Sequence, residues 1–204
     1  MAKRSGPQRK RNITRPGRLR IVAGKWRSRL LPIADVPGLR PTSERIRETL
    51  FNWLSPGIEG SRCLDLFAGS GALGFEALSR GAAAVTFVDS SAAAIANLQQ
   101  SAVALGATGA NIVKKDGAAF LDGFSGEKYD LVFLDPPFSG NPAVDLCRLL
   151  ANSNVLADGA QIYLERERGQ VAPDLPDGWF GVHGKIAGNV SYSLYGTAPK
   201  ESGK

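Results

Sequence analysis

The spacing of apolar positions along the chain predicts where strands and helices lie. From residue 62 onward, short apolar runs alternate with stretches in which apolar residues recur at helical spacing. The predicted strands are residues 63–67, 84–88, 111–113, 129–134 and 160–164. The predicted helices are residues 72–80, 91–105, 118–121 and 143–150. This alternation predicts an α/β fold with a mostly parallel sheet and helices on both faces.

The C-terminal part departs from this alternation. Residues 179–186 and 189–195 form two further apolar runs, and only Ala187 and Gly188 separate them. So short a connection leaves no room for a crossover helix, which parallel strands require. We therefore expect an antiparallel hairpin at one edge of the sheet.

The N-terminal part adds a second small unit before the core. Two short runs flank Gly24 and Lys25, which predicts a β-hairpin with a turn at these residues and arginines on one face. Thr42 or Ser43 can then cap a helix. The apolar stripe of that helix recurs at i, i+4, i+7 and i+8, namely Ile46, Leu50, Trp53 and Leu54.

These segments predict the domain organisation. We expect a disordered basic arm over residues 1–17 and a single domain over residues 18–204. Within that domain we expect a hairpin and loop, a helix and a core, over residues 18–40, 41–55 and 62–196.

Composition excludes several classes of protein. Hydrophobic residues make up 43% of the 204 residues and charged residues 22%, as in ordinary globular domains. No apolar run approaches the roughly 20 residues of a membrane span. Cys63, Cys147 and the single His183 do not suggest a metal or redox cluster, so we expect inert cysteines and a structural histidine. We expect a cytoplasmic monomer that binds neither metal nor membrane.

The charge of the chain is concentrated at its N-terminus. Residues 1–29 hold 11 of the 25 Lys and Arg residues and no acid, whereas the rest carries 14 Lys and Arg against 19 Asp and Glu. A basic segment of this kind is typical of nucleic-acid binding, because Lys and Arg displace counterions from phosphates. A solvated tail without a partner is the alternative.

A glycine-rich segment follows the first core strand. Gly69, Gly71 and Gly74 satisfy G-x-G-x-x-G, and Asp89 follows Gly69 by 20 residues at the end of the next strand. Glycines allow close approach of a ligand, and the acid can bind ribose hydroxyls. The pattern fits a dinucleotide site, an S-adenosylmethionine site or a tight turn without ligand. Asp65 favours S-adenosylmethionine, because a carboxylate would attract an ammonium group and repel a pyrophosphate.

Asp116 ends the third core strand and has two interpretations. Its carboxylate could accept a hydrogen bond from an adenine amino group. It could also cap the short helix that follows, and the two roles are compatible.

The segment with the most specific chemistry is Asp135-Pro136-Pro137-Phe138, at the carboxyl end of the fourth strand. An exocyclic amine of a nucleobase is a poor nucleophile, because its lone pair is delocalised into the ring. The Asp135 carboxylate and the Pro136 carbonyl could accept its two N–H groups and leave the lone pair pointing at an electrophile. The prolines fix the backbone, and Phe138 offers a face on which a base can stack.

Four segments together resemble the RsmD family, whose members methylate the N2 amine of a guanine in bacterial 16S rRNA, conventionally nucleotide 966. They are residues 20–27, 38–42, 45–54 and 65–74, and the similarity runs from about Leu19 to Tyr195. The resemblance implies a Rossmann-like class I methyltransferase that uses S-adenosylmethionine and prefers small-subunit assembly particles to free RNA. The arm before Arg18 is longer than in the family, so nothing about it carries over.

The resemblance also assigns roles to residues. The cofactor site would be lined by Asp65, Phe67, Ala68, Gly69, Gly71, Asp89, Ser90, Asp116 and Gly117. The target guanine would be held by Asp135, Pro136, Pro137 and Phe138. Apart from the resemblance, the basic charge of the N-terminal segment predicts that RNA phosphates are bound by Arg18, Arg20, Lys25, Arg27, Arg29 and Arg40.

Three alternatives remain open. An adenine-N6 methyltransferase would use the same Asp135–Phe138 motif, but the chain has no room for a separate target-recognition region. An NAD-dependent oxidoreductase fits the glycine loop and leaves Asp65 and Asp135 unexplained. A non-catalytic RNA-binding assembly factor would keep the basic arm and the fold but would not bind the cofactor.

Overall fold

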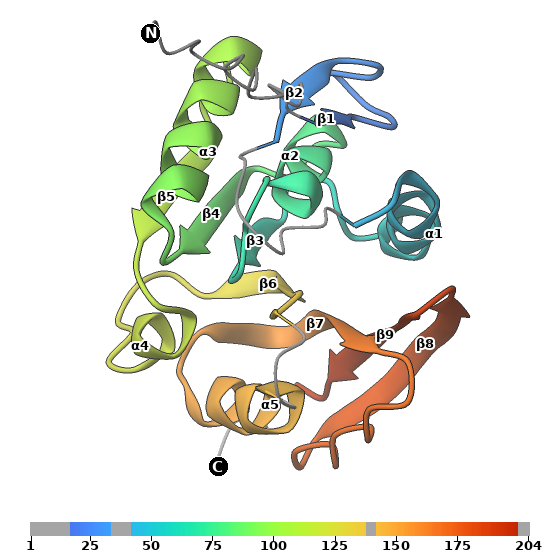
Figure 1. Ribbon diagram of the computed structural model, residues 1–204. Coiled ribbons are helices and arrows are strands. Elements are labelled where there is room, and N and C mark those ends of the chain that lie inside the picture. The colour runs from blue at the N-terminus through green and yellow to red at the C-terminus, as the bar shows by residue number, and fades with distance from the viewer. Residues whose placement is uncertain (1–16, 34–41, 138–141, 200–204) are drawn as a thin grey trace, which may run out of the picture.

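One mixed β-sheet dominates the computed structural model, which describes residues 17–33, 42–137 and 142–199 (Figure 1). In these residues the sheet has seven strands in the order β5-β4-β3-β6-β7-β9-β8. The strands are β3 (Arg62–Asp65), β4 (Ala84–Asp89), β5 (Ala110–Lys114), β6 (Tyr129–Leu134), β7 (Leu156–Glu167), β8 (Trp179–Ala187) and β9 (Val190–Thr197). The helices are α1 (Glu44–Leu54), α2 (Ala72–Ser79), α3 (Ala92–Leu105), α4 (Gly117–Leu121) and α5 (Pro142–Asn152). A separate two-stranded sheet consists of β1 (Arg18–Arg20) and β2 (Leu30–Pro32).

The strand order reverses in the middle of the sheet. β3 pairs in parallel with both β4 and β6, and the sheet grows outward from this pair through β5 on one side and β7 on the other. β9 then inserts antiparallel between β7 and β8. The predicted mostly parallel sheet with an antiparallel edge pair is therefore confirmed. In open α/β sheets, ligands bind outside the carboxyl ends of the strands at such a reversal point, here between β3 and β6.

Alternate residues of the central strands pack on opposite faces of the sheet. Cys63 and Phe133 belong to the apolar cluster that includes side chains of α1, α2 and α3. Leu64 and Val132 belong to the cluster that includes side chains of α4 and α5. Figure 1 shows these two groups of helices on opposite sides of the sheet. Burial on both faces explains why the parallel strands are continuous apolar runs in the sequence, and it confirms the predicted helices on both faces.

Helix α1 begins where its cap signal predicts. Ser43 is the N-cap, and its side chain accepts a hydrogen bond from the Ile46 N–H at 3.3 Å. Of the predicted apolar stripe, Ile46, Leu50 and Leu54 are buried and Trp53 is half-buried. Thr42, the other predicted cap, is therefore not the residue that caps this helix.

The N-terminal hairpin forms, but its predicted turn is wrong. The antiparallel strands β1 and β2 pair Leu19 with Leu31, and residues 21–29 form a loop between them instead of a short turn at Gly24 and Lys25. Within the hairpin, Leu19 is buried and both arginines of β1 are exposed, as predicted for a strand with arginines on one face. Some of the backbone donors of the loop are used outside the hairpin.

The loop of residues 21–29 is hydrogen-bonded to α2. The N–H groups of Val22 and Ala23 donate to the Glu76 carboxylate at 2.8 and 3.0 Å. The Ser79 hydroxyl donates to the Ala23 carbonyl at 2.6 Å. These partners lie more than 50 residues away in the chain, so the local turn pattern gave no sign of them.

Gly24 is the point of closest approach between this loop and α2. Its φ is +81°, and a Cβ built there would lie 1.9 Å from the Ser79 carbonyl oxygen. Gly60 has a similar φ of +73°, but a Cβ there would meet nothing within 4 Å. Comparing the same substitution at the two glycines therefore distinguishes the effect of backbone strain from the effect of a steric clash.

We predict that Gly24→Ala destabilises the protein more than Gly60→Ala. Both variants lose roughly 1–2 kcal/mol to the left-handed backbone, and Gly24→Ala loses roughly a further 1–3 kcal/mol to overpacking against α2. Urea unfolding of both variants measures the difference. Equal losses would show that the loop does not depend on its contact with Ser79.

Candidate functional site

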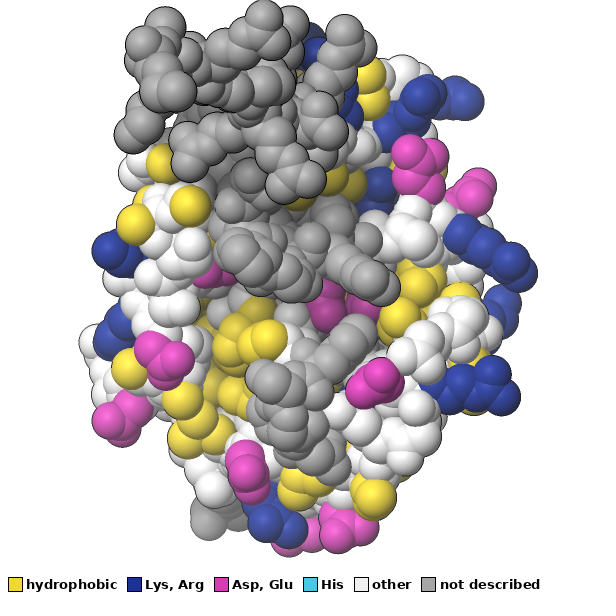
Figure 2. Space-filling model, in the orientation of Figure 1, with side chains coloured by type: hydrophobic (Ala, Val, Ile, Leu, Met, Phe, Trp, Pro, Cys, Tyr) yellow, Lys and Arg dark blue, Asp and Glu magenta, His cyan; other side chains and the backbone are white. Residues whose placement is uncertain are grey.

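Three aspartates lie at the carboxyl ends of neighbouring parallel strands. Asp65 ends β3, Asp89 ends β4, and Asp135 directly follows β6. Figure 2 shows some acidic side chains near the middle of the face in view, and further acidic and basic side chains around its edge. The sequence therefore brings together, at the reversal point of the sheet, the acids that it predicted for one site.

The glycine loop between β3 and α2 is held by two of these acids. The Asp65 carboxylate accepts a hydrogen bond from the Gly74 N–H at 3.0 Å. The Asp89 carboxylate accepts from the Gly69 N–H at 2.8 Å through one oxygen and from the Ser91 N–H at 2.8 Å through the other. Both acids therefore fix the backbone of the loop, a role that the sequence did not predict.

The other predicted cofactor residues surround the same loop. A Cβ at Gly117 would lie 2.9 Å from the Phe67 ring, so α4 begins against that ring. Asp116 caps α4 by accepting a hydrogen bond from the Ala119 N–H at 3.0 Å, and the helix-cap interpretation is confirmed. Its contact with an adenine stays a prediction.

The remaining three members of the predicted cofactor set differ in exposure. Ala68 is buried and its N–H donates to the Val88 carbonyl at 3.0 Å. Gly71 is buried and caps α2 in a left-handed conformation, with φ of 77°. Ser90, after the end of β4, is exposed.

Asp65 is in an unusual electrostatic environment. Its side chain is only 3% exposed, and among the described residues no Lys, Arg or His forms an ion pair with it. Burial raises the pKa of Asp65 to about 7, the Gly74 hydrogen bond opposes this rise, and the charge of Asp89 adds to it. A cationic group placed beside Asp65 would therefore bind favourably.

Asp135 lies beside a second buried acid, which the sequence analysis missed. The Thr42 hydroxyl donates to the Asp135 carboxylate at 3.2 Å. Burial raises the pKa of Asp135 well above its usual range, and the charge of Glu165 on β7 raises it further. The Tyr163 hydroxyl donates to Glu165 at 2.8 Å. The signal for Glu165 was an acid directly after an apolar run, as Asp89 and Asp135 also are.

The structure describes the first three residues of the Asp135–Phe138 motif. Pro136 is buried and Pro137 is exposed. Phe138 lies outside the described residues, so its stacking role stays a prediction.

The predicted RNA-binding side chains of the hairpin are exposed, but some have partners within the protein. These side chains are Arg18, Arg20, Lys25, Arg27 and Arg29. Arg29 donates to the Ala104 carbonyl at 2.9 Å, and Arg20 lies 3.7 Å from the carboxylate of Glu44. The Lys25 ammonium lies 5.6 Å from the centre of the Trp26 ring. Arg40 lies outside the described residues.

Comparison with known proteins identifies the family. The family model described as "Conserved hypothetical protein 95" matches residues 19–196. The Escherichia coli (strain K12) protein named "Ribosomal RNA small subunit methyltransferase D" is 45% identical over 186 residues, which cover 91% of this chain and 93% of that protein. This chain belongs to the RsmD family. The Haemophilus influenzae protein of the same name is 43% identical over 182 residues, which cover 88% and 94% of the two chains.

Solved structures confirm the predicted Rossmann-like class I methyltransferase fold of this RsmD-family chain. The yhhF protein from Escherichia coli has a TM-score of 0.83 at 42% identity, and the match covers 89% of this chain and 99% of that one. The magnesium protoporphyrin IX methyltransferase from Synechocystis PCC 6803, solved with bound SAM, has a TM-score of 0.59 at 18% identity. That match covers 76% of this chain and 79% of the other, and it concerns the fold alone.

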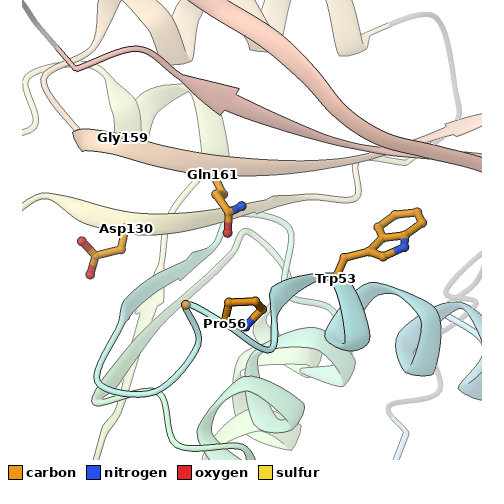
Figure 3. Close-up of a pocket in the computed structure, with 6 residues that line it drawn as sticks. Trp53, Pro56, Asp130, Gly159 and Gln161 are labelled. Atoms are coloured by element: carbon orange, nitrogen blue, oxygen red, sulfur yellow. The ribbon is translucent and has the colours of Figure 1, made fainter.

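A polar pocket lies away from this site. It is lined by Trp53, Pro56, Gly57, Asp130, Gly159 and Gln161. Figure 3 shows Gln161 pointing from β7 toward Pro56, while the Asp130 carboxylate points to one side. Asp130 lies near the start of β6, so the pocket is at the opposite end of that strand from Asp135. It brings together none of the predicted site residues.

The two cysteines that we expected to be inert are buried, and the histidine that we expected to be structural packs on an aromatic ring. Burial raises the pKa of Cys63 to about 12 and that of Cys147 to about 11, which leaves both as unreactive thiols. The His183 ring stacks on Trp53 with 4.9 Å between ring centres. The described residues contain no group of His, Cys, Asp and Glu that could hold a metal ion, and no helix that could span a membrane.

We predict that Asp65→Asn changes how stability depends on pH. Between about pH 4 and pH 7 the folded protein keeps the Asp65 proton that the unfolded chain has lost, so stability falls as pH rises through this range. The amide introduced by the substitution does not titrate and is free of this effect. Urea unfolding should therefore show equal stability of the two proteins near pH 4. By pH 8 the variant should be more stable, by on the order of a few kcal/mol.

The exposed Asp145 on α5 provides the matched control, because Asp145→Asn should leave the pH profile unchanged. Parallel profiles of wild type and Asp65→Asn would contradict the raised pKa of Asp65.

Proposed function

We propose that this chain transfers a methyl group from S-adenosylmethionine to the exocyclic N2 amine of a guanine in 16S rRNA. Family resemblance points to nucleotide 966 within a small-subunit assembly particle. The observation that carries the proposal is the position of Asp135, Pro136 and Pro137 after β6, next to β3 and its glycine loop. The relatives named as small-subunit rRNA methyltransferases support the choice of an rRNA substrate.

The residues at the ends of β3, β4 and β5 fit the cofactor. Asp65 is a buried carboxylate that has one backbone N–H as its hydrogen-bond partner, and it would bind the ammonium group. Asp89 would bind the ribose hydroxyls, and Asp116 the adenine amino group. Phe67, packed at Gly117, would line the adenine side of the site. When bound, S-adenosylmethionine supplies an electrophilic methyl group on a sulfonium.

The residues after β6 would prepare the nucleophile. The guanine must leave its stack to reach them, at a cost of a few kcal/mol that is smaller in a loop. The Asp135 carboxylate accepts one N2–H and the Pro136 carbonyl the other, which favours a lone pair directed away from the ring plane. Two prolines hold these acceptors in place, so positioning supplies most of the rate enhancement. N2 gains a methyl group and loses one proton.

The basic hairpin would supply affinity for RNA. Arg18, Lys25 and Arg27 are exposed, and none of them forms an ion pair with a described carboxylate. They can therefore neutralise phosphates, whereas Arg29 is already used in a contact with α3. The expected single domain over residues 18–204, the monomer and the cytoplasmic location stay predictions of this proposal.

Identification of the modified nucleoside tests the proposal directly. Small subunits that lack this modification are incubated with the protein and methyl-labelled S-adenosylmethionine, then digested to nucleosides. Labelled N2-methylguanosine is the expected product. Labelled adenosine would favour the adenine-N6 alternative, and absence of both label and cofactor binding would favour a non-catalytic assembly factor.

We predict that Asp135→Ala abolishes methyl transfer and keeps cofactor binding. Loss of the carboxylate that holds the amine should lower turnover on the order of 100-fold or more. The Kd for S-adenosylmethionine should not change, because Asp65, Asp89 and Asp116 are intact. Calorimetry and the labelling assay measure the two quantities. Asp145→Ala on the exposed side of α5 is the control, and wild-type turnover in Asp135→Ala would rule out the assignment.

We predict that replacing Arg18, Lys25 and Arg27 with Gln flattens the salt dependence of RNA affinity. Each lost phosphate contact should reduce the slope of log K against log salt by about 0.7–0.9. Binding titrations at several salt concentrations measure this slope. Arg148→Gln, an exposed site on α5, should leave it unchanged. An unaltered slope in the triple variant would assign RNA binding to another surface.

A further inference from the structure

Glu165 is a buried acid to which the proposed methyl transfer assigns no role. It lies near the end of β7 and is 3% exposed. In the parallel register, Phe133 of β6 pairs with Tyr163 of β7, and Leu134 pairs with Leu164. One step further along both strands come Asp135 and Glu165. The sheet itself therefore places the two carboxylates side by side.

One hydroxyl group serves both carboxylates. The Thr42 hydroxyl donates to Asp135 at 3.2 Å, and a hydrogen bond from Thr42 also lowers the pKa of Glu165. The hydroxyl carries a single proton and can donate to one acid at a time. Glu165 has a donor of its own in the Tyr163 hydroxyl, at 2.8 Å. In the part of the chain that the structure describes, donors are therefore scarce around Asp135, and it competes with Glu165 for one of them.

Among the described residues, the charged and titratable groups that act on the pair are acids and tyrosines. Glu165 and Asp65 of β3 both raise the pKa of Asp135. Glu165 faces Tyr163 on its own strand and Tyr192, its register partner on β9. Burial raises the pKa of Glu165, and its hydrogen bonds to Tyr163 and Thr42 oppose that rise. The charge of Glu165 makes the Asp135 carboxylate more basic.

We propose that Glu165 is a positioning residue that shares the Thr42 hydroxyl with Asp135 and makes Asp135 a stronger acceptor for the N–H of the target amine. This inference rests on the proposed function, since it concerns the acceptor that holds N2. A more basic carboxylate makes a stronger hydrogen bond to the amine, and it takes the departing N2 proton more readily. The proton moves to Asp135, while Glu165 keeps its charge and touches no substrate atom.

The pH dependence of turnover tests this role. Transfer requires ionised Asp135, so its pKa sets the acidic limb of the profile. Glu165→Gln removes the charge that raises this pKa, and the limb should move to lower pH, with a lower plateau. Thr42→Val removes a hydrogen bond that lowers the same pKa, and the limb should move to higher pH. If Glu165 and Thr42 had purely structural roles, their substitutions would lower the rate but would not move the acidic limb in opposite directions.

Glu167→Gln is the matched control. Glu167 lies two residues further along β7, accepts a hydrogen bond from the Asn189 side chain, and is half-buried. Its substitution should leave the limb where it is in the wild type. Thr42→Val also keeps the test decisive if Glu165→Gln does not fold.

A titration of carboxyl groups by ¹³C NMR, without substrate, gives a second readout. The Asp135 midpoint should fall in Glu165→Gln and rise in Thr42→Val. An active wild type whose limb and midpoint do not move in these variants would overturn the inference. Failure of the proposed function has a different signature, because the wild type itself would then form no N2-methylguanosine.

Discussion

The buried ion pair between Arg47 of α1 and Glu76 of α2 connects the N-terminal hairpin to the site. Arg47 is 1% exposed, and its guanidinium donates to Glu76 at 3.1 Å, to the Arg20 carbonyl at 2.8 Å and to the Thr42 carbonyl at 3.2 Å. Glu76 in turn accepts from two N–H groups of the hairpin loop. The position of Thr42, whose hydroxyl reaches Asp135, therefore depends on the same guanidinium that fixes the hairpin.

This pair defines geometry more than it adds stability. Desolvation lowers the pKa of Arg47, and the charge of Glu76 opposes that effect. Removing two charges from water offsets most of their attraction, so a buried pair adds little net stability, whereas loss of one partner is strongly destabilising. The four donors around Glu76 come from three segments, namely two N–H groups of the hairpin loop, Arg47 of α1, and Arg80 at the C-terminal end of α2 at 2.8 Å. A carboxylate that requires several donors at once permits few alternative ways to pack the hairpin.

The sequence predicted the local features of this molecule and missed the contacts between distant segments. The boundaries of β6 match the prediction, because its apolar residues are buried on both faces and charged residues flank the run. The hairpin turn was wrong because the donors of Val22 and Ala23 find Glu76, far away in the chain. Thr42 was predicted as a helix cap and as part of segment 38–42, and its contact with Asp135 was not foreseen. Glu165 was missed because its importance comes from the register of β7 beside β6, which periodicity does not reveal.

The three aspartates of the site differ in role because they differ in the number of hydrogen-bond donors around them. Asp89 accepts from two backbone N–H groups and holds the glycine loop. Asp65 accepts from one and is left with a raised pKa that a cation would relieve. Asp135 has a shared hydroxyl and an acid beside it. From β4 to β6 the donors to the carboxylates thus become fewer, and burial raises the pKa of both Asp65 and Asp135, which suits binding of a cationic cofactor group at one and acceptance of an amine proton at the other.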